Sequence, residues 1–142
     1  MANLIYSTAK GDFADGTNDW DAGGQTYRVL LTTSTYTPVA SHQFVSSITN
    51  ELAGGGYTRK DLTTRTVTAN GANFDLKADN TAYTALTNGQ TAAWAIVYKF
   101  VTNDADSRLI AAIDLAPGVI MTGDVTIKWD AAASNGAIVR IS

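Results

Sequence analysis

Few of the residue types that carry out chemistry in proteins occur in this sequence, and those that do are scattered. The chain contains a single histidine, His42, and no cysteine. A histidine that activates a serine needs that serine presented nearby, and the sequence has no Gly-x-Ser-x-Gly motif. A zinc site usually combines several histidine or cysteine ligands, so one histidine does not suffice. We therefore expect His42 to be a surface residue with a local hydrogen bond.

Two predicted loops are rich in the carboxylate and amide oxygens that calcium prefers. The first holds Asp12, Asp15, Asn18, Asp19 and Asp21, and the second holds Asn103, Asp104 and Asp106. Neither loop follows the EF-hand pattern, which has ligands at alternate positions, a glycine at the sixth and a glutamate at the twelfth. The sequence therefore favours solvated turns, and we predict no metal site.

Two further patterns bear on phosphate and sugar chemistry. Residues 54–60 read Gly-Gly-Gly-Tyr-Thr-Arg-Lys and lack the Gly-Lys-Ser/Thr ending of a phosphate loop, so a hinge with positive φ is favoured. Glycoside hydrolysis needs two carboxylates across a cleft, but Glu51 is the only glutamate and no aspartate stands out as its partner. We predict no catalytic, cofactor-binding or metal-binding residues, and we predict that the protein is not an enzyme.

Four aromatic residues in or beside predicted loops leave a sugar-binding alternative open. They are Trp20, Tyr36, Tyr57 and Tyr83. Aromatic faces can stack on sugars, yet aromatic side chains also supply much of the buried area of a small β-domain. We favour the second interpretation, in which these residues anchor loops to the core.

The elements that would position all these residues are mostly strands. Residues 93–101 are rich in β-branched and aromatic types, with bulky side chains on one side and small ones on the other. The bulky side chains are those of Trp94, Ile96, Tyr98 and Phe100. This pattern predicts a central strand whose large face lies in the core and whose other face is partly covered.

Further short alternating runs predict strands on both sides of this one. They lie at 3–8, 25–33, 65–69, 73–77, 81–86, 109–115, 124–130 and 137–141. Asn70-Gly71 is a strong hairpin signal, and Phe74 and Leu76 should then face the core. Pro117-Gly118 is expected to be a turn. In the run at 109–115, we expect Leu109, Ala111, Ile113 and Leu115 to share one face.

Only residues 41–53 have a helical pattern. Ser41 can cap a helix there, apolar residues recur at three- and four-residue steps, and Gly54 is placed to end it. The serines, threonine and asparagine inside this stretch are poor helix formers, so we expect one or two turns at most.

The regular spacing of short strands, with almost no helix, predicts an all-β fold. We favour a single-domain antiparallel β-sandwich of about eight strands, jelly-roll or immunoglobulin-like, with at most one short helix, over a small barrel. There is no internal repeat, so the domain should span residues 1–142. Residues 1–9 are either its first strand or an extended arm that docks on a neighbour.

Composition excludes several classes of function. The 142 residues are 45% hydrophobic and 16% charged, with a net charge of −3 and scattered basic residues, so nucleic-acid binding is not expected. The absence of cysteine excludes a disulfide framework. No run approaches the roughly 20 apolar residues of a transmembrane helix, and the N-terminus lacks the pattern of a signal peptide. We expect a protein made in a cytoplasm, not exported and not bound to a membrane.

A series of short motifs runs along most of the chain. They are Asp19-Trp20, the threonine-serine-x-tyrosine-threonine-proline turn at 33–38, His42 with Phe44, Asn50-Glu51, and Gly56-Tyr57-Thr58. A looser match follows in Tyr98, residues 109–114, and Ile127-Lys128-Trp129 ahead of a glycine. In this pattern the chain resembles a group of small virion proteins encoded by tailed bacteriophages.

The resemblance implies a non-enzymatic virion protein, and specifically a capsid decoration (cement) protein on the outside of the head. Such proteins are commonly all-β and commonly trimeric or dimeric, so the implied partners are the major capsid protein and further copies of this chain. The alternative is a tail-fibre or receptor-binding module that recognises a host surface glycan. The lack of a coiled-coil or repeat shaft favours decoration.

Overall fold

The structure is a computed structural model, and it describes residues 3–129 and 135–141. Within these residues the chain forms strands β1 (Leu4–Ile5), β2 (Thr26–Thr32), β3 (Lys60–Asp61), β4 (Thr66–Asn70), β5 (Asn73–Asp79), β6 (Thr81–Leu86), β7 (Thr91–Phe100), β8 (Arg108–Ile120), β9 (Gly123–Ile127) and β10 (Asn135–Ile141). The helices are α1 (Ser7–Ala14) and the single 3₁₀ turn η1 (Val45–Ser47). The prediction of an all-β sandwich with little helix is confirmed.

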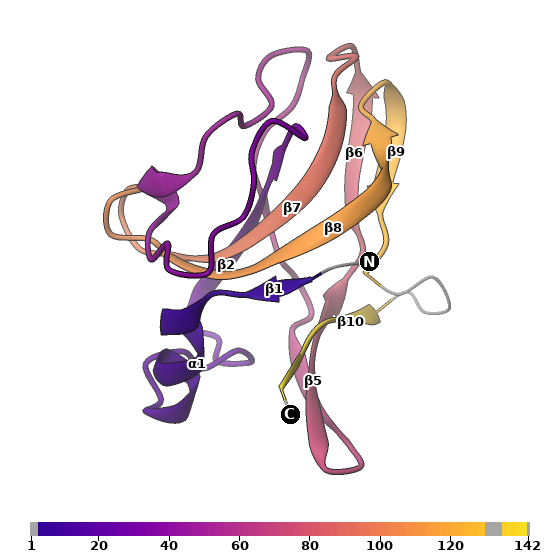
Figure 1. Ribbon diagram of the computed structural model, residues 1–142. Coiled ribbons are helices and arrows are strands. Elements are labelled where there is room, and N and C mark those ends of the chain that lie inside the picture. The colour runs from indigo at the N-terminus through magenta and orange to yellow at the C-terminus, as the bar shows by residue number, and fades with distance from the viewer. Residues whose placement is uncertain (1–2, 130–134, 142) are drawn as a thin grey trace.

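The strands form antiparallel sheets in two layers (Figure 1). One layer is a five-stranded sheet in the order β1-β8-β7-β2-β3, with β7 at its centre as predicted. The other combines a three-stranded sheet, β10-β5-β4, with the two-stranded sheet β6-β9. Only Asn80 separates β5 from β6, so these two sheets continue one another along the chain.

The main core lies between the two layers because β2 and β7 direct alternate apolar side chains inward. From the five-stranded sheet come Tyr27, Val29, Leu31, Ala95, Val97 and Ile113. The opposite layer contributes Leu76, Ala78, Tyr83, Leu86, Ile127, Ile138 and Val139. The small-residue face of β7 therefore belongs to the main core.

A second apolar cluster covers the outer face of the five-stranded sheet. Leu30, Ile96, Tyr98 and Leu109 project outward from the sheet and are fully buried. Loop and N-terminal residues cover them, namely Tyr6, Tyr36 and Val45. This sheet is thus buried on both faces, which explains why its strands read as nearly continuous apolar runs.

The hairpin predicted around Asn70-Gly71 is confirmed, with Gly71 at a φ of 63° in the turn between β4 and β5. The prediction that Phe74 and Leu76 both face the core is correct for Leu76 and wrong for Phe74. Both lie on the same side of β5, but Phe74 is close to the hairpin tip, beyond the end of the five-stranded sheet that covers Leu76. Its side chain is 52% exposed.

The helix predicted at 41–53 is wrong. Within this segment only the single turn η1 is helical. Further along, the backbone lies beside β2, where the N–H of Leu52 donates to the Leu31 carbonyl at 2.9 Å. Asn50 has a φ of 58°, which is incompatible with a helix interior. An α-helix, α1, lies instead at Ser7–Ala14, where a strand and a loop were expected.

Strand β8 is longer than predicted. It continues through Pro117-Gly118, where a turn was expected, and still pairs with β7 at Val119 and Ile120. A bulge also inserts Ile110 between the residues that pair with Val97 and Tyr98. Side-chain alternation therefore breaks, and Leu109 faces the outer cluster while Ala111 and Ile113 face the main core.

The first and last described strands, β1 and β10, both belong to the sandwich (Figure 1). Leu4–Ile5 pair with β8 of the same chain, and Tyr6 and Ala9 are buried behind them. The docking-arm prediction for residues 1–9 stays a prediction. At the other end β10 begins at Asn135, two residues before the predicted strand at 137–141, and Asp130 of the predicted strand at 124–130 lies outside the described residues.

Among the helices that the structure describes, none has the length and apolar character needed to cross a membrane.

Candidate functional site

The four loop aromatics are buried, as the packing interpretation predicted. Trp20 lies 4.8 Å from the Tyr27 ring, centroid to centroid, and its indole N–H donates to the Lys77 carbonyl at 2.8 Å. Tyr57 stacks on Tyr83 with 6.0 Å between ring centroids. All four rings are almost completely shielded from solvent, as expected of residues that anchor loops to the core.

The single histidine makes the local contact that was expected. His42 is partly exposed and its Nδ1 lies 3.4 Å from the hydroxyl of Tyr36. Tyr36 in turn shares a buried hydrogen bond of 3.0 Å with the hydroxyl of Tyr6. Burial raises the pKa of Tyr6 far above its usual range, so this hydroxyl stays protonated. The group fastens the loop at 33–42 over the outer cluster.

Side chains of the two Asp-rich loops make local contacts within the protein. Asp12 is mostly buried, with one carboxylate oxygen 3.5 Å from Nη1 of Arg108. In the second loop Asn103 accepts hydrogen bonds from the backbone N–H groups of Ala105 and Asp106, which is the geometry of a capped turn. Across residues 3–129 and 135–141, no three acidic or histidine side chains gather as ion ligands would.

The three glycines at 54–56 all have positive φ, as predicted for a hinge. Gly55 lies directly against the backbone of Asn88, and a Cβ at this position would overlap Asn88. The N–H of Thr87 donates to the Gly55 carbonyl at 2.9 Å. This close approach requires glycine and fixes the direction in which the chain proceeds to Tyr57 and Arg59.

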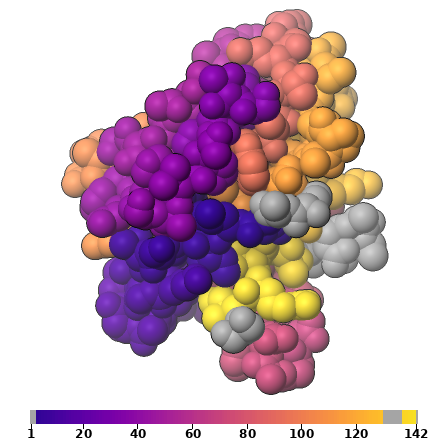
Figure 2. Space-filling view, in the orientation of Figure 1, coloured from indigo at the N-terminus to yellow at the C-terminus, as the bar shows by residue number. Residues whose placement is uncertain are grey.

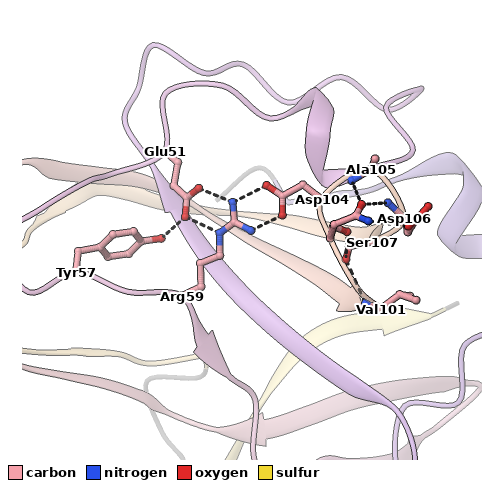
Figure 3. A network of polar contacts seen from close by, with 9 residues as sticks. Glu51, Tyr57, Arg59, Val101, Asp104, Ala105, Asp106 and Ser107 are labelled. Atoms are coloured by element: carbon pink, nitrogen blue, oxygen red, sulfur yellow. Dashed lines mark hydrogen bonds and ion pairs between the residues drawn. The ribbon is translucent and has the colours of Figure 1, made fainter.

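A network of polar contacts that the sequence did not reveal is centred on Arg59 (Figure 3). Arg59 lies between the carboxylates of Glu51 and Asp104 and contacts each through two nitrogens. Its Nε and Nη2 donate to Glu51 at 2.8 and 2.7 Å, and its Nη1 and Nη2 donate to Asp104 at 2.6 and 2.9 Å. Tyr57 adds an O–H bond to Glu51 at 3.1 Å.

The members of this network come from two connections, and Glu51, Tyr57 and Arg59 share the one between β2 and β3. Glu51 pairs with Thr32 at the end of β2, Arg59 precedes β3, and Asp104 is in the turn between β7 and β8. Arg59 thereby joins the long 33–59 connection to the central β7–β8 hairpin. The guanidinium also lies 5.7 Å from the ring centroid of Tyr98, within cation–π distance.

The electrostatics of the network oppose a catalytic role. The hydrogen bonds to Arg59 lower the pKa of Asp104, and the two carboxylates raise the pKa of Arg59 still further above its usual value. A general acid or base near neutral pH needs the opposite, a group whose pKa is brought toward 7. The single guanidinium holds both carboxylates, so the network acts as a clamp between loops.

The β4–β5 hairpin is exposed to solvent, and its tip protrudes beyond the body of the domain (Figure 2). All five residues of β4 are exposed, and β4 is the edge strand of its sheet. Val67 is 41% and Phe74 52% exposed, and both project from the same face of the hairpin. We call β4 together with Phe74 the hairpin surface.

Next to the hairpin surface is an open groove of about 390 Å³ between the hairpin and α1. Its apolar lining comes from Phe13, Trp20, Val67, Phe74, Leu76 and Ile141. Lys10 and Asp19 line it as well and carry opposite charges. The apolar character of the hairpin surface thus continues toward α1.

Comparison with known proteins identifies no relative: no family model, no curated protein and no solved structure matches the chain.

Proposed function

We propose that this protein is a non-enzymatic structural component of a bacteriophage virion, and specifically a capsid decoration protein that binds the outer surface of the head and stabilises the shell. Its partners in this proposal are the major capsid protein and further copies of the chain. The starting point is the resemblance of the motifs between Asp19 and Thr58 to those of phage virion proteins.

The residues that carry this resemblance have structural roles in the fold, which supports the proposal. Trp20 holds a loop to the carbonyl of Lys77, and Glu51 binds the clamp residue Arg59. The hydroxyl of Tyr57 accepts a hydrogen bond from the N–H of Leu31 at 2.8 Å. A motif made of such residues specifies a rigid scaffold, which is what a many-copy shell component requires.

The single observation that carries the proposal is the hairpin surface on this rigid sandwich. An exposed, uncharged edge strand with apolar side chains beside it is a surface suited to contacts with other chains. A decoration protein acts through such contacts and needs no reacting group.

A binding experiment with heads that lack the protein tests the proposal. Purified protein would be mixed with bare heads and with isolated tails from the same phage, and each mixture would be sedimented and then imaged. We expect saturable binding to heads in a regular array, together with higher resistance of the heads to heating. Binding to tails alone, or to neither particle, would contradict the decoration proposal.

A further inference from the structure

We propose that the hairpin surface pairs with the same surface of a second copy, so that two β4 strands meet antiparallel across a two-fold axis at Thr68. The inference deepens the proposed function and rests on it in one respect, because a shell component needs contacts between its copies. The partner strand in this proposal is β4 itself, in a register that follows from the pairing of β4 with β5.

The edge of β4 lacks the features that normally keep sheet edges apart. Edge strands are commonly protected by charged side chains, prolines, bulges or a covering segment. The sequence of β4 is Thr-Val-Thr-Ala-Asn, and its pairing with β5 runs without a register shift from Thr66 to Asn70. It carries no charge, so two copies can lie side by side with no like charges opposed.

The backbone of β4 offers a self-complementary set of hydrogen-bonding groups. Asn70 and Asn73 flank the two-residue turn and form the first hydrogen-bonded pair of the hairpin, so the pattern alternates from there. The N–H and C=O groups of Val67 and Ala69 consequently point away from β5. Pairing Val67 of one copy with Ala69 of the other, and the reverse, joins these groups in four hydrogen bonds.

The side chains suit the same register. Val67 and Ala69 lie opposite Leu76 and Phe74 on β5, so all four project from one face. In the paired arrangement Ala69 would stand between Phe74 and Val67 of the second copy. Alanine is small, so the exposed Phe74 ring can lean across it toward that valine and remove apolar surface from water.

The polar face of the sheet also accepts a second copy. Thr68 would lie directly opposite Thr68 of the other chain, where the two hydroxyls can hydrogen-bond. The nearest carboxylate on this face, Asp75, is opposite Thr68 on β5 and is already paired with Arg140 at 2.7 Å. The ion pair neutralises Asp75 within each copy.

The start of β4 is held in place, which favours association because little order has to be gained on binding. The guanidinium of Arg65 donates to the carbonyls of Trp20, Ala22 and Gln25 at 2.7, 2.9 and 2.6 Å. Two five-residue strands form a small interface compared with the roughly 1,200–2,000 Å² of stable complexes. We therefore expect weak pairing in dilute solution that strengthens where copies are crowded on a surface.

Cysteine cross-linking tests the register directly, because the natural chain contains no cysteine. In the proposed pair the two Thr68 Cα atoms are about 4.5 Å apart, as in a non-hydrogen-bonded antiparallel pair, and a disulfide can bridge them. Thr66 is the matched control, since it shares the strand and the face with Thr68. The Cα atoms of Thr66 in the two copies would be about 14 Å apart, because they are offset by four residues along the strand direction. This distance is too long for a disulfide.

The isolated Thr68→Cys and Thr66→Cys proteins would be oxidised mildly at equal concentration and separated on a non-reducing gel. We expect the Thr68→Cys dimer to form at least about tenfold faster, because pairing raises the effective concentration of the two thiols. Adding Val67→Lys, which places a charge on the paired edge, should remove this difference while circular dichroism shows an intact fold.

Equal rates for Thr68→Cys and Thr66→Cys would overturn the inference, as would a Thr68→Cys rate that Val67→Lys does not change. Since the experiment uses no capsid, such a result leaves the decoration proposal standing. The reverse also holds, because rapid Thr68→Cys cross-linking in a protein that binds no heads supports strand pairing and contradicts only the decoration proposal.

Discussion

Replacing Arg59 by methionine tests the clamp between loops most sharply. The substitution keeps a long apolar side chain and removes the guanidinium from Glu51 and Asp104. Side chains of Arg59 and Glu51 are 28% and 27% exposed, so we assign this pair about 1.5–2 kcal/mol, within the range for charge-assisted hydrogen bonds. Asp104 is 43% exposed and its pair is screened by solvent, which reduces its contribution to about 0.5–1 kcal/mol.

Arg59→Met should therefore lower the free energy of unfolding by about 2–3 kcal/mol, out of the 5–15 kcal/mol typical of a domain. Urea unfolding at pH 7, followed by the fluorescence of the buried tryptophans, measures this change. Lys128→Met is the matched control: it removes the same charge from an exposed side chain and should cost no more than about 0.5 kcal/mol. Equal effects of the two substitutions would refute the clamp.

The pH dependence gives an independent test of the same contact. Arg59 lowers the pKa of Asp104 in the folded protein, so the pair stabilises the fold above the unfolded pKa of about 3.9. That stabilisation is lost as the pH falls through the folded pKa. The difference in stability between the wild-type protein and Arg59→Met should hence shrink as the pH is lowered from about 5 to about 3. A difference that stays constant over this range would contradict the assignment.

Two further stability predictions come from the loops. Tyr6→Phe removes the buried hydroxyl that bonds to Tyr36 and should lower the free energy of unfolding in urea by about 1–1.5 kcal/mol. Tyr83→Phe is the control, because the buried Tyr83 hydroxyl has no hydrogen-bond partner in the described part of the chain, and its loss should not change the free energy of unfolding. The reverse order of the two effects would be inconsistent with the structure. Gly55→Ala should prevent or severely impair folding, because residue 55 has a φ of 58° and the added Cβ would overlap the backbone of Asn88. Gly24→Ala is the control: a Cβ there meets open space, so this variant should unfold at nearly the wild-type urea concentration.

The central strands and the hairpin were predictable because their signals are local and strong. Between Ala93 and Tyr98, β7 alternates small and large apolar residues, and no competing periodicity fits it. The β4–β5 hairpin follows from a turn dipeptide between two alternating runs. The sequence pattern could not predict that the five-stranded sheet, which faces β5, ends before it reaches Phe74. The Phe74 side chain is exposed for this reason.

The errors share a physical cause, namely that tertiary contacts decided structures with weak local signals. Helix α1 has no capping side chain and no amphipathic pattern, and it is held where Ala9 and Asp12 are buried against the body. The segment 41–53 has a stronger helical periodicity than α1. Its apolar residues instead pack in the outer cluster, as Val45 and Ile48 do, or lie beside β2, as Leu52 does. Likewise, Pro117-Gly118 is accommodated inside β8.

The clamp was missed because its members are far apart in the sequence. Glu51 and Asp104 are separated by 53 positions, and nothing in one sequence indicates that both approach Arg59. The one available signal was that the only glutamate and an arginine flank a glycine hinge. That signal is too weak to predict a contact, whereas the absence of recognisable catalytic motifs could be read directly.

Localisation of the protein on purified virions tests the central claim most directly. Virions of the phage that encodes it, with separated heads and tails, would be labelled with an antibody against this chain and imaged, and copies per particle would be counted. The decoration proposal predicts dense, regular signal on the heads, in hundreds of copies. Signal confined to the tail or its fibres, or none on any particle, would contradict it.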